Sequence, residues 1–466
     1  LRLRQPDLSN SRQRGACIAR IEEVDGALNA FVTLDLEGAR EAAKEAEDAV
    51  RAGELLSALH GLPLGIKDLT ATAGIKTTFG SLLYENHVPD ADDPIVDNLR
   101  DEGAIILGKT NTPEFGAGAN TKNRVFGATG NPFDPHKTCG GSSGGSAVAL
   151  ATGQVPLATG SDYGGSLRTP AAFCGVVGFR PSPGVVPAVE RAASLLPFSV
   201  QGPMARTVAD VHLLYRAQAD VDPRDPYSSR DAFDLADALM PADLSEVDVA
   251  FSSDLGACPV DDAIAAVFKA RTDSFRQAFA NADDAAPDFS DVHESFEILR
   301  GVNFVAAHRE RLERHRDKLG PNVIDNTTRG LAYDLGDVAR AHTQQTALYH
   351  RFNAFFDDFD VLICPAAAVS PFPHEQNTIE TINGEAMPTY MRWLALTYAP
   401  TMALACAAVL PCGVDEAGMP FGLQVIGPKG ADGTVLAVAA ALEAKLARDP
   451  VTARPQADLA ALQRTS

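Results

Sequence analysis

A glycine-rich stretch at residues 139–179 constrains the backbone of this chain more than any other segment. Four glycines surround the pair Ser142–Ser143, and two more stand directly before Ser166. Glycine loses more conformational entropy on folding than any other residue, so this density indicates a backbone that needs positive φ or close approach to a ligand. A flexible linker is the poorer interpretation, because the stretch contains the apolar run 151–162, which suits a buried strand.

The serines of this stretch need a base, and a lysine is better placed than a histidine. Serine is a weak nucleophile until a neighbour takes its proton. His136 is the only histidine near the stretch, whereas Lys67 follows the apolar segment Leu-Pro-Leu-Gly-Ile at 62–66. Burial lowers a lysine pKa from about 10.4 by several units. We therefore expect Lys67 to lose its proton readily.

Four motifs resemble the amidase signature family, serine hydrolases that act on carboxylic amides. Residues 140–145 read Gly-Gly-Ser-Ser-Gly-Gly, residues 162–170 fit D-x-G-G-S-x-R-x-P, and residues 172–178 fit A-F-C-G-x-x-G. The family's lysine lies in a G-x-K-D segment, which is found here at 65–68. The resemblance extends from about residue 27 to about residue 428, and the stretch 210–355 contributes nothing specific to it.

The resemblance implies a role for each of these residues. Ser166 is expected to be the nucleophile, Ser142 a bridging serine that relays protons, and Lys67 the base. The family also has a cis bond before the bridging serine, here Gly141–Ser142. Ser143 is expected to be structural.

Oxyanion and substrate contacts are expected around the same loops. Consecutive N–H groups after Asp162 can point at one spot, which is how an oxyanion hole is built. The expected donors are the N–H groups of Tyr163, Gly164, Gly165 and Ser166. Gly116 lies in the stretch 114–118, which matches a pocket-lining stretch of the family.

Arg168 has two interpretations, since it could bind a substrate carboxylate or pair with Asp162 to stiffen the loop. We favour the second.

Two other segments match known motifs in their residue pattern alone. Residues 103–110 fit the P-loop string, but the four residues inside it are Ala-Ile-Ile-Leu, a strand rather than a flexible loop. Residues 141–145 fit the nucleophile elbow around Ser143, but the residues before it, 131–140, have loop chemistry where the elbow needs a strand. Neither nucleotide binding nor an α/β-hydrolase elbow is favoured.

The sequence favours neither a metal site nor a disulfide framework. Ten histidines are scattered, and His308 and His315 are interpreted as part of a solvated helix face. The seven cysteines are widely spaced. Cys139 abuts the glycine loop and is interpreted as a pocket-wall thiol rather than a nucleophile. No cofactor is expected.

Net charge and hydropathy limit the kinds of partner that are expected for this chain. The net charge of −21 argues against nucleic-acid binding, and no run of 18 apolar residues predicts a membrane span. Free cysteines and the lack of a visible signal peptide favour the cytoplasm. A small-molecule amide is the expected partner, and a homodimer is compatible with these features.

Apolar runs and helical patterns alternate along the chain. Continuous apolar runs predict buried strands at 104–108, 155–160, 175–179, 247–252, 359–364, 402–409 and 422–426. Helices are expected at 36–52, which is polar nearly all round, and at 207–218, 261–280, 294–318 and 334–357. Together with the resemblance, this predicts a single large layered α/β domain over 1–466. Its central sheet is expected to be mixed but mostly parallel, covered by helices on both faces. The core motifs occupy about 55–205 and 358–445, and a helical variable insert occupies about 210–355.

Substrate specificity is expected to reside in the later part of the chain. Candidate pocket segments are 372–374, 387–393 and 398–400, and Trp393 is a pocket wall or a core anchor. The leading function is hydrolysis of a linear carboxylic amide through an acyl-enzyme. The alternatives are a glutaminase or amidotransferase-type subunit that needs a partner protein, and a non-catalytic scaffold. Residues 197–203 lack the acidic residue expected before the glutamine in the amidotransferase branch.

Overall fold

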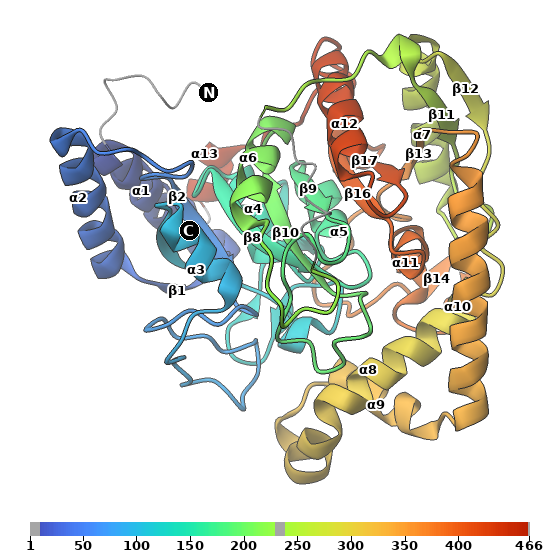
Figure 1. The fold of residues 1–466 in the computed structure, drawn as a ribbon, viewed down its shortest axis with the longest axis horizontal. Helices are drawn as coiled ribbons and strands as arrows, with labels where there is room; N and C mark the ends of the chain where they lie inside the picture. The colour runs from blue at the N-terminus through green and yellow to red at the C-terminus, as the bar shows by residue number, and fades with distance from the viewer. Residues whose placement is uncertain (1–9, 229–237, 465–466) are drawn as a thin grey trace.

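A mixed sheet of eleven strands forms the centre of the molecule in a computed structural model, which describes residues 10–228 and 238–464 (Figure 1). In spatial order the strands are β1 (Phe31–Leu34), β3 (Ile105–Thr110), β2 (Pro63–Lys67), β8 (Leu157–Asp162), β10 (Val200–Ala205), β9 (Val177–Arg180), β16 (Cys406–Val414), β17 (Pro420–Gly427), β13 (Val361–Pro365), β11 (Asp248–Phe251) and β12 (Asn281–Asp284). Short hairpins pair β4 (Lys122–Asn123) with β5 (Gly127–Ala128), β6 (Gly130–Asn131) with β7 (Asp134–Thr138), and β14 (Thr381–Ile382) with β15 (Glu385–Ala386).

Helices surround this sheet. They are α1 (Asn10–Leu28), α2 (Leu36–Ala52), α3 (Pro94–Asp101), α4 (Gly144–Ala151), α5 (Arg168–Cys174), α6 (Val208–Gln218), α7 (Asp262–Phe275), α8 (Val292–His315), α9 (Pro321–Ala332), α10 (Leu335–Phe355), α11 (Ala395–Met402), α12 (Asp432–Leu446) and α13 (Leu459–Gln463). Every residue of β2, β13 and β17 is buried. Successive strand residues point to opposite faces, so both faces of the sheet are covered. The expected layered α/β domain is confirmed.

The expectation of mostly parallel pairing is wrong. Of the ten strand pairings in the eleven-stranded sheet, as the structure describes it, four are parallel and six are antiparallel. A continuous apolar run reports that both faces of a strand are buried, and it carries no information on strand direction. Antiparallel strands under helices on both faces therefore give the same pattern as parallel ones.

Most predicted elements are present, with two corrections to their character. Helix α2 has the predicted bounds but buries a stripe of Ala39, Ala43 and Ala46, because small alanines at helical spacing suffice for packing on one face. The predicted strand at 402–409 begins only at Cys406, since Met402 ends α11. Strands β2 and β10, which flank β8, were not predicted.

The stretch 210–355 contributes more than helices. It contains α7, α8, α9 and α10, and also strand β11 and the edge strand β12 of the main sheet. Helices α8, α9 and α10 gather at the end of the molecule away from α1 and α2 (Figure 1). The predicted domain range 1–466 includes residues 1–9, 229–237 and 465–466, which lie outside the described residues.

Candidate active site

Three predicted catalytic residues lie on loops and a strand end around β2 and β8. Lys67 is the last residue of β2, Ser142 precedes α4, and Ser166 lies between β8 and α5. The side-chain nitrogen Nζ of Lys67 lies 2.7 Å from Ser142 Oγ and 2.9 Å from both Ser143 Oγ and Ser161 Oγ. Lys67 is 1% exposed. A single buried amine thus contacts the predicted bridging serine directly.

Burial tunes this lysine toward its neutral form. Removal from water lowers the pKa of Lys67 to about 7, although the charge of nearby Asp162 opposes the shift. Burial would raise the pKa of Asp162 as well, but Arg168 and Arg180 outweigh it and hold that pKa well below its usual range. Lys67 therefore lies near an ionised carboxylate, while burial brings its pKa close to neutral pH.

The loop that carries Ser142 packs so tightly that it requires glycine. The Gly141–Ser142 peptide bond is cis, as the family resemblance implied. A Cβ on Gly145 would lie 2.3 Å from the backbone nitrogen of Asn111, and one on Gly141 would lie 2.9 Å from the carbonyl carbon of Ala119. The glycines in this loop therefore serve close packing, in agreement with the interpretation of the sequence.

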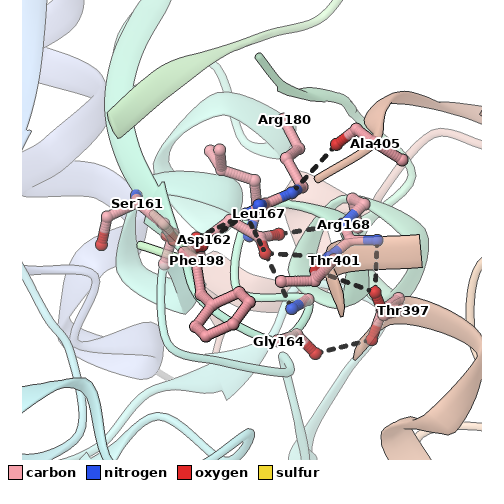
Figure 2. A network of polar contacts seen from close by, with 12 residues as sticks. Ser161, Asp162, Gly164, Leu167, Arg168, Arg180, Phe198, Thr397, Thr401 and Ala405 are labelled. Atoms are coloured by element: carbon pink, nitrogen blue, oxygen red, sulfur yellow. Dashed lines mark hydrogen bonds and ion pairs between the residues drawn. The ribbon is translucent and has the colours of Figure 1, made fainter. Parts of the chain in front are cut away.

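The loop that carries Ser166 is fixed by the Asp162 carboxylate and by α11 (Figure 2). The N–H groups of Gly165 and Leu167 donate to Asp162 at 2.9 and 3.0 Å. Thr397 Oγ1 donates to the Gly164 carbonyl at 2.7 Å. Gly165 has φ +124°, and a Cβ there would lie 2.2 Å from Thr397 Oγ1. No side chain other than hydrogen fits at this position.

This hydrogen bond corrects one expected oxyanion donor. The Gly165 N–H is engaged by Asp162 and is not free for substrate. Within residues 10–228 and 238–464, the N–H groups of Tyr163, Gly164 and Ser166 donate no hydrogen bond. These three remain the candidate donors.

Arg168 is a buried anchor rather than a substrate ligand. Its guanidinium pairs with Asp162 at 2.9 Å, donates to the Thr397 carbonyl at 2.7 Å and to Gln424 Oε1 at 2.8 Å, and is fully buried (Figure 2). Arg180 shares the same carboxylate at 3.3 Å. The interpretation that pairs Arg168 with Asp162 is confirmed.

Both catalytic serine candidates open into one cleft of about 780 Å³. Ser142, Ser161, Tyr163 and Ser166 line it. Gly116 also lines it, at the end of the short helix η2 (Glu114–Gly116), and a Cβ there would lie 3.4 Å from Ser142 Oγ. Lys67 lies beneath this surface. The cleft therefore gives a ligand access to the serines but not directly to the base.

Ser143 contacts the base instead of the cleft. Its Oγ accepts from Lys67 and lies 3.3 Å from both the N–H and the carbonyl oxygen of Ser161. The segment before it contains the short strand β7, where only loop was expected, but β7 pairs with β6 outside the main sheet. The Ser143 hydroxyl is thus held by Lys67 and Ser161, away from the cleft.

The P-loop-like segment at 103–110 is almost entirely buried and does not form a ligand-binding loop. Lys109 lies in strand β3, is fully buried, and donates to the Thr70 carbonyl and to Thr72 Oγ1 at 2.7 Å. Burial lowers its pKa to about 7, although Asp68 and Asp93 oppose the shift. A strand in place of a phosphate-binding loop agrees with the rejection of nucleotide binding.

None of the predicted pocket segments lines this cleft, and helix α8 forms its opposite wall. Its cleft residues are Arg300, Asn303, Phe304, Ala306, Ala307, His308 and Arg311. Phe79, Tyr84 and Phe115 add an aromatic side. Trp393 is 2% exposed, lies against Phe173 and Phe372, and anchors the core.

Two further expectations are corrected by burial. His308 is 6% exposed and its ring lies 4.7 Å from that of Phe115, so it faces the cleft and not the solvent. Cys139 is fully buried with its thiol directed at the Thr129 carbonyl, and burial raises its pKa to about 12. It is a core thiol that does not line the cleft.

Helix α8 is also connected, through α11, to the loop that carries Ser166. Phe296 of α8 stacks on Tyr398 of α11 with ring centres 4.0 Å apart and planes 5° apart. Tyr398 follows Thr397, the residue that holds the Gly164 carbonyl. One short helix thus contacts both α8 and the loop before Ser166.

The described residues hold neither a metal cluster nor a membrane-spanning helix. Across residues 10–228 and 238–464 no group of three or more histidine, cysteine, aspartate or glutamate side chains could hold a metal ion. Over the same ranges no helix combines the length and apolarity required to cross a bilayer.

Comparison with known proteins identifies the family. Residues 15–436 match the family model described as Amidase. The chain belongs to the amidase family. An acylamidase from Rhodococcus erythropolis is 34% identical over 94% of this chain and 92% of its own. A glutamyl-tRNA(Gln) amidotransferase subunit from Acidothermus cellulolyticus is also 34% identical, over 92% of this chain and 90% of its own.

Solved amidase-family structures share this fold. The crystal structure of a bacterial aryl acylamidase superposes with a TM-score of 0.85 at 27% identity, covering 98% of this chain and 95% of that chain. Enzymes of the amidase signature hydrolyse amide C–N bonds, and that general chemistry applies to this member. Sequence reasoning missed Ser161, although it directly precedes Asp162 in the quoted motif, and it missed the α8 wall, for which no motif exists.

Proposed function

We propose that this amidase-family protein hydrolyses a carboxylic amide to an acid and an amine or ammonia through an acyl-enzyme on Ser166. The observation that carries the proposal is the contact of 2.7 Å between Lys67 Nζ and Ser142 Oγ beneath a cleft that Ser142 and Ser166 share. Neutral Lys67 accepts the Ser142 proton as Ser142 accepts that of Ser166. The Ser166 oxygen then attacks the amide carbonyl.

The second half of the step returns the proton. The tetrahedral oxyanion is stabilised by the free N–H groups of Tyr163, Gly164 and Ser166, and such donors contribute about 10²–10³ in rate each. Ser142 passes its proton to the leaving nitrogen and is reprotonated by Lys67. Water then attacks the acyl ester through the same relay and releases the acid.

The test is an assay of the purified protein on aliphatic and aryl amides. Ser166→Ala should lose about 10⁴-fold or more of kcat, because a nucleophile knocked out of such a unit costs nearly the whole catalytic effect. Ser199→Ala is the matched control, since Ser199 lines the same cleft without a chemical role. Hydroxylamine should intercept the acyl ester and release the substrate acid as its hydroxamate, and an acyl-enzyme isolated by acid quench without hydroxylamine should carry its acyl group on the peptide that contains Ser166. Activity retained in Ser166→Ala would refute the assignment.

A second candidate is a glutaminase subunit that acts with a partner protein. The relatives named as amidotransferase subunits favour it, at 34% identity for the Acidothermus protein. Glutamine hydrolysis that appears only after a co-purifying protein is added would support this candidate. Robust hydrolysis of simple amides by the isolated chain would support the stand-alone enzyme, and inactivity under both conditions would favour a non-catalytic scaffold.

A further inference from the structure

Helix α8 presents two arginines to the cleft that holds Ser142 and Ser166. Arg300 and Arg311 both line it. Arg300 is 5% exposed, and its guanidinium carbon lies 4.7 Å from the ring centre of Phe304 and 5.3 Å from that of Tyr163. Tyr163 stands three residues before Ser166. The charge on Arg300 therefore lies close to the nucleophile loop.

The hydrogen bonds of Arg300 leave part of its guanidinium without a partner. Its Nε donates to Asn326 Oδ1 at 2.9 Å, and its Nη2 donates to Tyr390 OH at 2.9 Å. For Nη1 no hydrogen bond exists within the part of the chain that the structure describes. Over the same ranges the buried Tyr163 hydroxyl also has no partner. The cleft wall thus has, on two neighbouring side chains, two polar groups without a hydrogen-bond partner among the described residues.

No ion pair neutralises this arginine within the part of the chain that the structure describes. The other buried arginines of the fold are paired, since Arg168 and Arg180 contact Asp162 and Arg191 contacts Asp225. Neither Arg300 nor Arg311 forms an ion pair among residues 10–228 and 238–464, in a chain whose net charge is −21. A buried charge with neutral partners only is unfavourable, and an anionic ligand would relieve that cost.

The remaining charged side chains of the cleft form no ion pair with Arg300 among the described residues. Asp92, Asp93 and Glu190 line the cleft, and Asp92 is paired with Arg100 at 2.8 Å. Arg311 donates to Tyr84 OH at 3.2 Å and lies 5.2 Å from the Phe115 ring centre. His308 lies on the same wall, and burial together with the charges of Arg311 and Arg300 lowers its pKa to about 3. The α8 wall is therefore positive, and the neutral imidazole does not compete for an anion.

We propose that the substrate is an amide that also carries a carboxylate, and that Arg300 binds this carboxylate. The inference rests on the proposed amide hydrolysis. Because Arg300 lies beside Tyr163, the carboxylate should be only a few bonds from the scissile carbonyl, as in the half-amide of a short dicarboxylic acid. The half-amide and one water give the dicarboxylic acid and ammonia. Arg168, the arginine that the sequence offered for this role, is committed to Asp162.

The experiment compares substrates that differ in charge alone. Succinamate, glutaramate and adipamate are assayed beside succinamide, glutaramide and adipamide, their neutral isosteres, at one ionic strength. The wild type should favour at least one half-amide over its diamide by about 10- to 100-fold in kcat/KM, the range for a charge-assisted hydrogen bond. Arg300→Gln should bring that ratio to about one, because it removes the charge that distinguishes a half-amide from its diamide.

Two variants separate recognition from structural support. Arg309→Gln removes the same charge from the solvent side of α8, where Arg309 is 63% exposed and pairs with Glu313, and it should keep the wild-type ratio. Arg300→Lys retains the charge without the planar fork and should keep an intermediate ratio. A purely structural Arg300 would lower both rates together and leave the ratio unchanged.

The outcomes are distinguishable from failure of the proposed function. Hydrolysis of diamides without preference for any half-amide would overturn the carboxylate inference and leave amide hydrolysis standing. Absence of all hydrolysis would overturn amide hydrolysis, and equilibrium binding of succinate, glutarate and adipate would then decide the inference. Binding of at least one dicarboxylate at least tenfold tighter than its diamide would support it, and equal binding would refute it. The same binding comparison on the wild type applies if Arg300→Gln does not fold.

Discussion

Replacing Ser161 by alanine should move the pH dependence of catalysis in a direction set by the geometry around Lys67. Ser161 Oγ lies 2.9 Å from Lys67 Nζ and accepts one of its hydrogen bonds. The protonated amine has three hydrogens to donate, whereas the neutral amine has two and must accept from Ser142. Loss of this acceptor therefore weakens the protonated form more, and the pKa of Lys67 should fall.

The magnitude follows from the value of a hydrogen bond to a charged group. Such a bond contributes up to about 3 kcal/mol, of which the neutral amine retains about half, so at this upper end the net change of about 1.5 kcal/mol is about one pKa unit. The pKa of Lys67 should move from about 7 to roughly 6. At pH 6 the neutral fraction would rise from about 10% to about 50%.

The assay is kcat/KM between pH 5 and 9 for an uncharged amide, which reports the free enzyme. Because neutral Lys67 is the active form, the rate should fall as pH drops through its pKa. This variant is informative because the pKa of buried Lys109 is also about 7. Lys109 contacts Thr70 and Thr72, not Ser161. The acidic limb of the plot of kcat/KM against pH would therefore shift in Ser161→Ala only if Lys67 is the group that titrates there.

Ser146→Ala is the control, since buried Ser146 donates to the Thr159 carbonyl at 2.8 Å and does not contact Lys67. In Ser146→Ala the pKa of the acidic limb should stay at about 7. An unmoved or upward-shifted limb in Ser161→Ala, or an equal shift in both variants, would refute the assignment of Lys67 as the base.

Two stability predictions test the loop that carries Ser166. Arg168→Met leaves the buried Asp162 carboxylate with one fewer partner and should cost about 3–5 kcal/mol in urea unfolding; a loss below about 1 kcal/mol would contradict its anchoring role. Gly165→Ala places a Cβ 2.2 Å from Thr397 Oγ1 at a positive φ and should cost roughly 2–4 kcal/mol. Gly433→Ala, in α12 with nothing within 4 Å, should instead stabilise by about 0.5–1 kcal/mol, and similar effects of both substitutions would argue against close packing at Gly165.

The loops around the serines could be predicted because local chemistry determines them. Glycines at 140–145 and 164–165 are required wherever backbones approach closely, and that requirement is visible in the sequence. The fixed spacing of Lys67, Ser142 and Ser166 within family motifs completes the pattern. The same reasoning erred at Gly165, because which N–H the Asp162 carboxylate takes depends on loop geometry.

The cleft wall could not be predicted, because its side chains are selected by tertiary packing. Helix α8 has charged residues along its length, and Arg309 is exposed while His308 beside it is buried. Trp393 is of a residue type that often lines pockets, yet its ring packs against Phe173 and Phe372. The prediction of mostly parallel strands was wrong for a related reason. An apolar run indicates that helices cover both faces of a strand, but it carries no information on the direction of the neighbouring strand.

The stack of Phe296 on Tyr398 limits how freely this scaffold can be re-engineered. Tyr398 and Thr397 are consecutive in α11, so a displacement of α8 reaches the Gly164 carbonyl through two direct contacts. Grafting α8 from a relative to change substrate preference would therefore also shift the candidate oxyanion donors. Productive exchanges should transplant α8 and α11 as one unit, or confine themselves to Arg300, Asn303 and Arg311, which face the cleft beyond the stack.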